Sequence, residues 1–153
     1  MSEDKAIAGR LQTPVVLIRA CAVLLAGLMA GHLSAYPWLS GHSAQVDALW
    51  QSMNSVSLEF AGQRSSYWHL YFGWGVLITL MLLAMAAILW LVSGLAVLAP
   101  RRVAAICGVF SAMSLVSAII SFRYFFIPPF IFYVITCLLL MVASIQLWKR
   151  SDS

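Results

Sequence analysis

The fold of this chain follows from residues 67–98, which read YWHLYFGWGVLITLMLLAMAAILWLVSGLAVL. This run carries no Asp, Glu, Lys or Arg, and as an α-helix it would be about 48 Å long at about 1.5 Å per residue. The hydrocarbon core of a bilayer is only about 30 Å thick. Tyr and Trp, which concentrate at the headgroup level, crowd the first turns of the run. We therefore expect a membrane-spanning helix whose first two turns stand in the outer interface.

The composition of the whole chain indicates that lipid is its main solvent. Of its 153 residues, 63% are hydrophobic and 9% are charged, whereas soluble domains carry about 25% charged residues. So few charges cannot cover a water-facing surface. The net charge of +4 comes from basic residues scattered at the ends of apolar runs, so we expect no nucleic-acid partner. The three cysteines lie inside apolar runs, and we interpret them as reduced packing residues.

Three further apolar runs predict additional spans. The four predicted spans are residues 14–36, 67–98, 103–122 and 130–148. The connections between them are short, apart from an outer loop at residues 38–66. We predict an all-α fold: an integral membrane four-helix bundle with a short amphipathic helix in the outer loop, in which residues 1–153 form a single membrane domain.

Local signals predict where the first span and the loop helix begin. Thr13 and Pro14 suit the N-cap and the first helical position, so residues 1–12 would be a loosely ordered tail. We expect this span to be retained, because no clean small-x-small cleavage site follows it. In the loop, spacing of i, i+3, i+4 and i+7 predicts an amphipathic helix with Ser43 as its N-cap, and Gly62 closes the loop. The apolar residues of that helix are Val46, Leu49, Trp50 and Met53.

The basic residues predict the orientation in the membrane. Seven fall on one side, and two, Arg64 and Arg123, fall on the other. The seven are Lys5, Arg10, Arg19, Arg101, Arg102, Lys149 and Arg150. Because short cytoplasmic segments carry an excess of Lys and Arg, we expect a multi-pass protein of the cell inner (plasma) membrane with both termini in the cytoplasm.

Aromatic side chains gather in the outer half of the predicted bundle and define the candidate site. Both interfaces should carry such residues, so the asymmetry favours a cluster beyond anchoring, with Gly73 and Gly75 leaving room for a ring or a ligand. We interpret the cluster as a binding site for an apolar ligand, a lipid or a quinone, or for a partner span. A filled aromatic core and simple anchoring are the alternatives. The candidate ligand-binding residues are His32, Glu59, Arg64, Tyr67, His69, Tyr71, Trp74, Arg123 and Tyr124.

Other functions remain open from the residues alone. Glu59 with His32 or His69 could supply acid–base groups, so the alternative is a small membrane enzyme acting on a lipid-like substrate. A transporter is less favoured because the spans lack acidic residues. We expect no metal site, because no His-x-x-x-His motif is present. Gly27 and Gly31 form a small-xxx-small motif, which could mediate a homo-oligomer or packing inside the bundle.

Three patches of the chain together resemble a known family. The patches are Gly31-His32-Leu33, residues 64–75 (RSSYWHLYFGWG) and residues 124–129 (YFFIPP). They are similar to a family of small bacterial four-span integral membrane proteins of uncharacterised activity, and the likeness covers almost the whole chain. The resemblance implies a four-helix membrane bundle and no particular activity. A looser similarity to DoxX-like proteins rests on topology and size, and claudins are excluded because their paired loop cysteines are absent.

Overall fold

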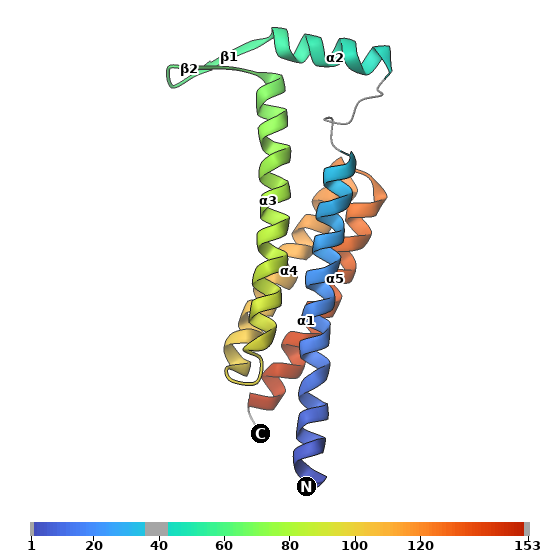
Figure 1. The fold of residues 1–153 in the computed structure, drawn as a ribbon, viewed down its shortest axis with the longest axis vertical. Coiled ribbons are helices and arrows are strands. Elements are labelled where there is room, and N and C mark those ends of the chain that lie inside the picture. The colour runs from blue at the N-terminus through green and yellow to red at the C-terminus, as the bar shows by residue number, and fades with distance from the viewer. Residues whose placement is uncertain (1, 36–42, 152–153) are drawn as a thin grey trace. The chain divides into compact units, whose positions relative to one another are not determined.

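The computed structural model describes the backbone of residues 2–35 and 43–151 and the side chains of residues 12–35 and 43–150. Within these residues, four helices are long and apolar enough to cross a membrane, which confirms the prediction of an all-α chain with four spans (Figure 1). The spanning helices are α1 (Ser2–Ala35), α3 (Tyr67–Gly94), α4 (Pro100–Tyr124) and α5 (Ile127–Ser151). Their length and composition indicate a multi-pass membrane protein.

The chain divides into two compact units. Unit 1 comprises Met1–Leu28 and Leu82–Ser153, and unit 2 comprises Met29–Met81. Unit 1 therefore holds the first part of α1, the last part of α3, and all of α4 and α5. Unit 2 holds the other parts of α1 and α3 and the segment that connects these helices.

The first helix begins earlier than the sequence predicted. α1 starts at Ser2 and continues through Pro14, so the expected helix start at Thr13 and the expected loose tail are wrong. Seven of the eleven residues at 2–12 are Ala, Glu, Lys, Arg, Leu or Gln, which favour helix, and the helix continues past the proline without the backbone hydrogen bond of that residue. The predicted end of this span at residue 36 and the start of the loop at residue 38 lie outside the described residues.

The other helix ends differ from the prediction by a few residues. α3 ends at Gly94 rather than Leu98, because the following residues form a turn in which Ala99 N–H donates to Leu95 O at 2.9 Å. Pro100 then occupies the first turn of α4. α5 begins at Ile127, so its two prolines also fall in a first turn, where a missing N–H costs little.

Side chains from four helices form the core of unit 1. The largest fully buried apolar side chains include Ile18 and Leu25 of α1, Leu89 of α3, Val103 of α4, and Leu140 and Leu147 of α5. Lipid tails are as apolar as these residues, so close packing and hydrogen bonds hold such helices together. Ser111 Oγ donates to the Cys137 carbonyl oxygen at 2.9 Å, which joins α4 to α5. Ser144 Oγ likewise donates to Ala104 O at 2.8 Å.

Small residues and cysteines act in packing, as expected. Cys21 and Cys107 are buried, Cys137 is half-buried, and all three are free thiols. A Cβ added at Gly27 would lie 3.7 Å from a ring carbon of Phe132, which is ordinary contact with α5. At Gly31 the same addition would meet no described atom within 4 Å. Gly27 is exposed but close to α5 within unit 1, whereas Gly31 presents open backbone.

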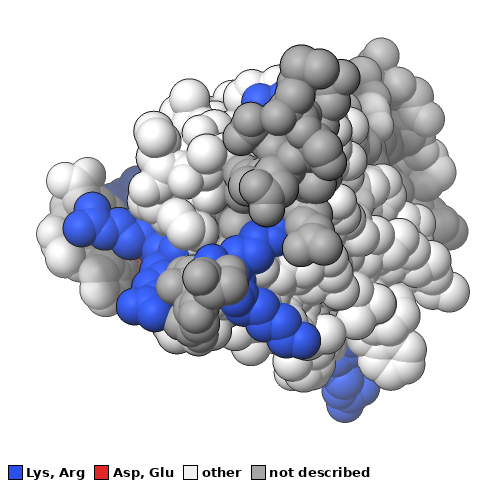
Figure 2. All heavy atoms as spheres, turned by 90° about the horizontal axis from the view of Figure 1, so that it is seen from below, with Lys and Arg blue, Asp and Glu red and all other residues white. Residues whose placement is uncertain are grey.

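One end of unit 1 is basic. Arg101 and Arg102 follow the first residue of α4, and Lys149 and Arg150 lie in the last turn of α5. Figure 2 views the molecule from the end at which the chain termini lie, and it shows Lys and Arg but, among the described residues, no Asp or Glu. These four residues, which the sequence predicts on one side of the membrane, thus share one end of unit 1.

Unit 2 contains the predicted loop helix and a hairpin that was not predicted. Ser43 caps α2 (Ala44–Ser55) by accepting a hydrogen bond from Val46 N–H at 3.4 Å, as expected. Strands β1 (Ser57–Phe60) and β2 (Gln63–Ser66) then pair antiparallel. Their turn residues, Ala61 and Gly62, have φ of 49° and 76°. Positive φ at both central residues is typical of the two-residue type I′ hairpin. The sequence pattern did not predict it because the strands are short and largely polar.

Candidate functional site

Ser66 lies at the junction of α2, the hairpin and α3. Only 5% of its surface is exposed. Its Oγ accepts a hydrogen bond from His69 N–H at 3.3 Å, so Ser66 is the N-cap of α3. The same hydroxyl donates to Asn54 Oδ1 of α2 at 3.3 Å. Tyr67 N–H, in turn, donates to Val56 O at 3.4 Å. These bonds fix the start of α3 against the end of α2.

An aromatic cluster, formed by Trp50, Trp68, Tyr71 and Phe72, reinforces this junction. The rings of Trp50 on α2 and Trp68 on α3 have centroids 5.0 Å apart. Trp68 also lies 6.1 Å from Tyr71 and 6.3 Å from Phe72. Tilted pairs at such distances contribute about 0.5–1.5 kcal/mol each beyond area burial. Trp50 is one of the half-buried residues of α2, as is Val46. The side of α2 that carries Trp50 is therefore the side that contacts α3.

Three predicted site residues present an open aromatic surface on the first turns of α3. Tyr67 is 49% exposed, Tyr71 is 45% exposed and Trp74 is 65% exposed. We call these three residues the aromatic surface. They are not the filled aromatic core that the sequence left as an alternative. The rings project from a helix start that the Ser66 hydrogen bonds and the Trp50–Trp68 contact connect to α2.

His32 joins α1 to α3 within unit 2. Its Nε2 lies 3.2 Å from the Gly75 carbonyl oxygen, and since a carbonyl can only accept, Nε2 carries the proton. Thr79 Oγ1 donates to the same oxygen at 2.9 Å. Gly75 is buried. His32 is therefore half-buried and connects α1 to α3 through Gly75. Gly75 directly follows Trp74, a residue of the aromatic surface.

Glu59 and Arg64 face each other across the hairpin. The strand register pairs them directly. Both side chains are exposed, and Arg64 Nη2 donates to Ser57 Oγ at 3.4 Å. Opposite charges directly across a ladder favour strand pairing.

The proposed acid–base groups lie in three different environments. Glu59 is on the exposed hairpin, His32 is bonded to a backbone carbonyl, and the His69 side chain is exposed on the first turn of α3. Among the described residues, no group of three or more His, Cys, Asp or Glu could hold a metal ion. Nothing in this geometry favours the enzyme over the binding protein.

Arg123 and Tyr124 belong to unit 1, at the last turn of α4. The Arg123 guanidinium carbon lies 6.0 Å from the centroid of the Tyr124 ring, at the limit of a cation–π contact. Both side chains are exposed. Nearby, the rings of Phe122 and Phe130 pack 5.3 Å apart and join α4 to α5. These two candidate residues thus form a local pair with each other.

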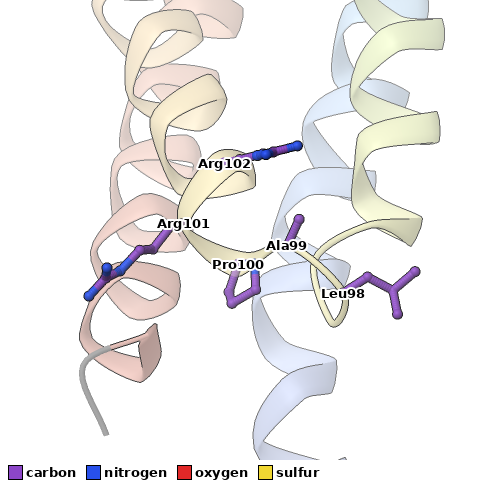
Figure 3. A pocket seen from close by; sticks show the side chains of 5 residues that line it. All are labelled: Leu98, Ala99, Pro100, Arg101 and Arg102. Atoms are coloured by element: carbon purple, nitrogen blue, oxygen red, sulfur yellow. The ribbon is translucent and has the colours of Figure 1, made fainter.

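A cavity of about 590 Å³ lies at the turn between α3 and α4. It is lined by Leu98, Ala99, Pro100, Arg101 and Arg102 (Figure 3). In Figure 3 the two arginines point to opposite sides of the first turn of α4, so they do not converge on one ligand.

Sequence reasoning missed the partners of Ser66 and His32. A serine directly before the first helical residue is an N-cap signal that could have identified Ser66. No local pattern marks the Gly75 carbonyl as the partner of His32.

Comparison with protein-family models, with curated proteins and with solved structures found no match to this chain.

Proposed function

We propose that this chain is a non-enzymatic protein of the inner (plasma) membrane, with both termini in the cytoplasm, and that its aromatic surface binds an apolar ligand, a lipid or a quinone. The observation that carries the proposal is the exposure of Tyr67, Tyr71 and Trp74, at 45–65%, on a fixed support. Rings that are already ordered lose little entropy on binding. A ligand with a flat ring or an acyl chain would cover the apolar area that they expose.

The orientation rests on the charges. The basic residues of the first part of α1, of the α3–α4 turn and of the end of α5 outnumber those on the other side by seven to two. The positive-inside rule then assigns them to the cytoplasm and assigns unit 2 to the outer face. The resemblance to small bacterial four-span proteins supports the inner membrane as the location. In this orientation the aromatic surface would lie at the outer headgroup level, where Tyr and Trp are favoured.

Mass spectrometry of the apolar molecules that copurify with the protein tests this function. We expect one lipid or quinone species to be enriched over its share of the membrane extract. Trp74→Ala and Tyr71→Ala should each lower that enrichment about fivefold, because each removes an exposed ring. Trp148→Ala is the matched control, since Trp148 is 52% exposed but lies on α5 in unit 1, and it should retain the ligand.

Two results would contradict the proposal. The first is a copurifying lipid mixture identical to that of the membrane. The second is equal enrichment in all three variants. Capture of another membrane protein that is lost in Trp74→Ala, without any enriched lipid or quinone, would instead show that the surface binds a partner span.

A further inference from the structure

Arg19 is a charged residue inside the first span, and two residues of α3 hold its side chain. The apolar part of α1 begins at Gln12 and runs to Ala35. Arg19 Nε donates to Ser93 Oγ at 3.1 Å. The guanidinium carbon lies 5.1 Å from the centroid of the Trp90 ring, within cation–π range. All three residues belong to unit 1.

The support beneath Arg19 is fixed. Ser93 is fully buried, and its hydroxyl donates to the Trp90 carbonyl oxygen at 2.7 Å while it accepts from Arg19. The hydroxyl is thus used as donor and as acceptor. Trp90 is 51% exposed, and Arg19 is itself exposed. The guanidinium plane is therefore oriented by the protein and accessible from outside it.

Most of the donors of Arg19 have no acceptor among the described residues. A guanidinium carries five N–H donors, and Ser93 uses the one on Nε. No described residue accepts a hydrogen bond from the four N–H groups on Nη1 and Nη2. These N–H groups are therefore available to an acceptor from outside the described residues.

The described side chains of unit 1 also offer no counter-charge to Arg19. Residues 12–28 and 82–150 contain no Asp or Glu. The basic residues in the same ranges are Arg19, Arg101, Arg102, Arg123, Lys149 and Arg150. Ser93 is the residue before the last one of α3, so its partner Arg19 is level with the end of a span. Lipid phosphates lie at that level, next to the tryptophans that favour the interface.

We infer that Arg19, oriented by Ser93 and supported by Trp90, binds the phosphate group of an anionic phospholipid. The planar fork of arginine matches two phosphate oxygens, and such charge-assisted bonds are strong. An anionic lipid is favoured over a zwitterionic one because the charged side chains described in this unit are all basic. The site lies in unit 1 and does not depend on the aromatic surface.

Native mass spectrometry of the detergent-purified protein tests the inference. Wild-type protein is mixed with equal amounts of phosphatidylglycerol and phosphatidylethanolamine, and the bound fraction of each is measured. We expect one phosphatidylglycerol to be retained in preference. Arg19→Gln should lower this retention about tenfold, because it removes a charge-assisted contact. Arg102→Gln, which removes an equal charge from another exposed position of unit 1, should leave it unchanged.

A second variant separates the orientation of Arg19 from its charge. Ser93→Ala keeps the charge but frees the side chain, and we expect it to lower retention about threefold. If circular dichroism shows that Arg19→Gln does not fold, the retention of phosphatidylglycerol by Ser93→Ala tests the inference instead. Equal retention of the two lipids by wild type, equal losses in Arg19→Gln and Arg102→Gln, or unchanged retention in Ser93→Ala would each overturn the inference. Displacement of the lipid by inorganic phosphate at matched concentration would overturn it too, in favour of a free anion.

Discussion

Ser66 is almost fully buried where α2, the hairpin and α3 meet, and its hydroxyl makes two hydrogen bonds there. His32 makes the corresponding connection between α1 and α3. Both are small polar contacts between segments that are otherwise apolar or exposed. A buried polar group that loses its partner costs about 1–3 kcal/mol, so single substitutions at these positions should have measurable effects.

Ser66→Ala should loosen the start of α3. The substitution removes the N-cap and the bond to Asn54, which together are worth about 1–2 kcal/mol. We expect hydrogen exchange of the amides at residues 67–70 to become about tenfold faster or more. Ser65→Ala is the control, because Ser65 is the neighbouring strand residue and is only half-buried. Equal exchange in the two variants would show that Ser66 does not cap the helix.

His32→Ala should weaken the contact between α1 and α3 in unit 2. Loss of the bond to Gly75 O is worth about 1 kcal/mol, and Thr79 would remain as the other donor to that oxygen. His32→Gln retains an N–H donor and should recover part of the loss. The midpoint of unfolding in detergent mixtures measures the effect. A glutamine variant no more stable than the alanine variant would argue against a hydrogen-bonding role.

At the scale of elements, the hairpin is the feature whose geometry is most demanding. Its two central residues both have positive φ, and one of them is an alanine. Non-glycine residues reach this region at a cost of about 1–2 kcal/mol. Asn tolerates it better than Ala, and Asn-Gly is the preferred type I′ pair. The hairpin therefore carries a local cost at Ala61 that a substitution can remove.

Ala61→Asn should stabilise the hairpin by about 0.5 kcal/mol, and Gly62→Val should destabilise it by about 1–2 kcal/mol. Hydrogen exchange across residues 57–66 measures both effects, slower in the first variant and faster in the second. The α4–α5 region should be unchanged in each and serves as the internal control. Faster exchange in Ala61→Asn would rule out the type I′ geometry.

At the scale of the whole molecule, charge asymmetry and span number together predict the topology. If all four candidate helices cross the membrane, both termini lie on one side of it, and the positive-inside rule predicts that the side carrying the basic end of unit 1 is the cytoplasm. Cys21 and Cys107 are fully buried within spans, whereas Cys137 is half-buried on α5, so a labelling test uses a Cys137→Ser background.

Cysteine labelling with a membrane-impermeant maleimide tests this topology. Gln45→Cys in α2 should be labelled in intact spheroplasts, and Lys149→Cys at the end of α5 should be labelled only after the membrane is disrupted. Both positions are exposed, so access of the reagent differs only by the side of the membrane. The reverse pattern would place the termini outside and the aromatic surface in the cytoplasmic leaflet.

The sequence by itself determined the fold class, the four spans and the loop helix with its Ser43 cap. These features depend on properties that add up along a short window: hydropathy over about 20 residues, helical spacing, and one capping side chain. The start of α1 and the hairpin were the local failures. At the start of α1, the helix propensity of the preceding residues outweighed the helix start that Pro14 indicated. In the hairpin, a two-residue turn paired two strands whose sequences are too polar to show a strand pattern.

Only the tertiary structure decided which polar groups meet. Arg19 and Ser93 are 74 residues apart in the chain, and His32 and Gly75 are 43 apart. Such contacts depend on how each helix is rotated against its neighbour, and an almost uniformly apolar sequence carries little information on that rotation. In a membrane, close packing and a few hydrogen bonds select the rotation, because lipid covers every apolar face equally well. Arg19 is the one of these polar groups for which we infer a lipid ligand.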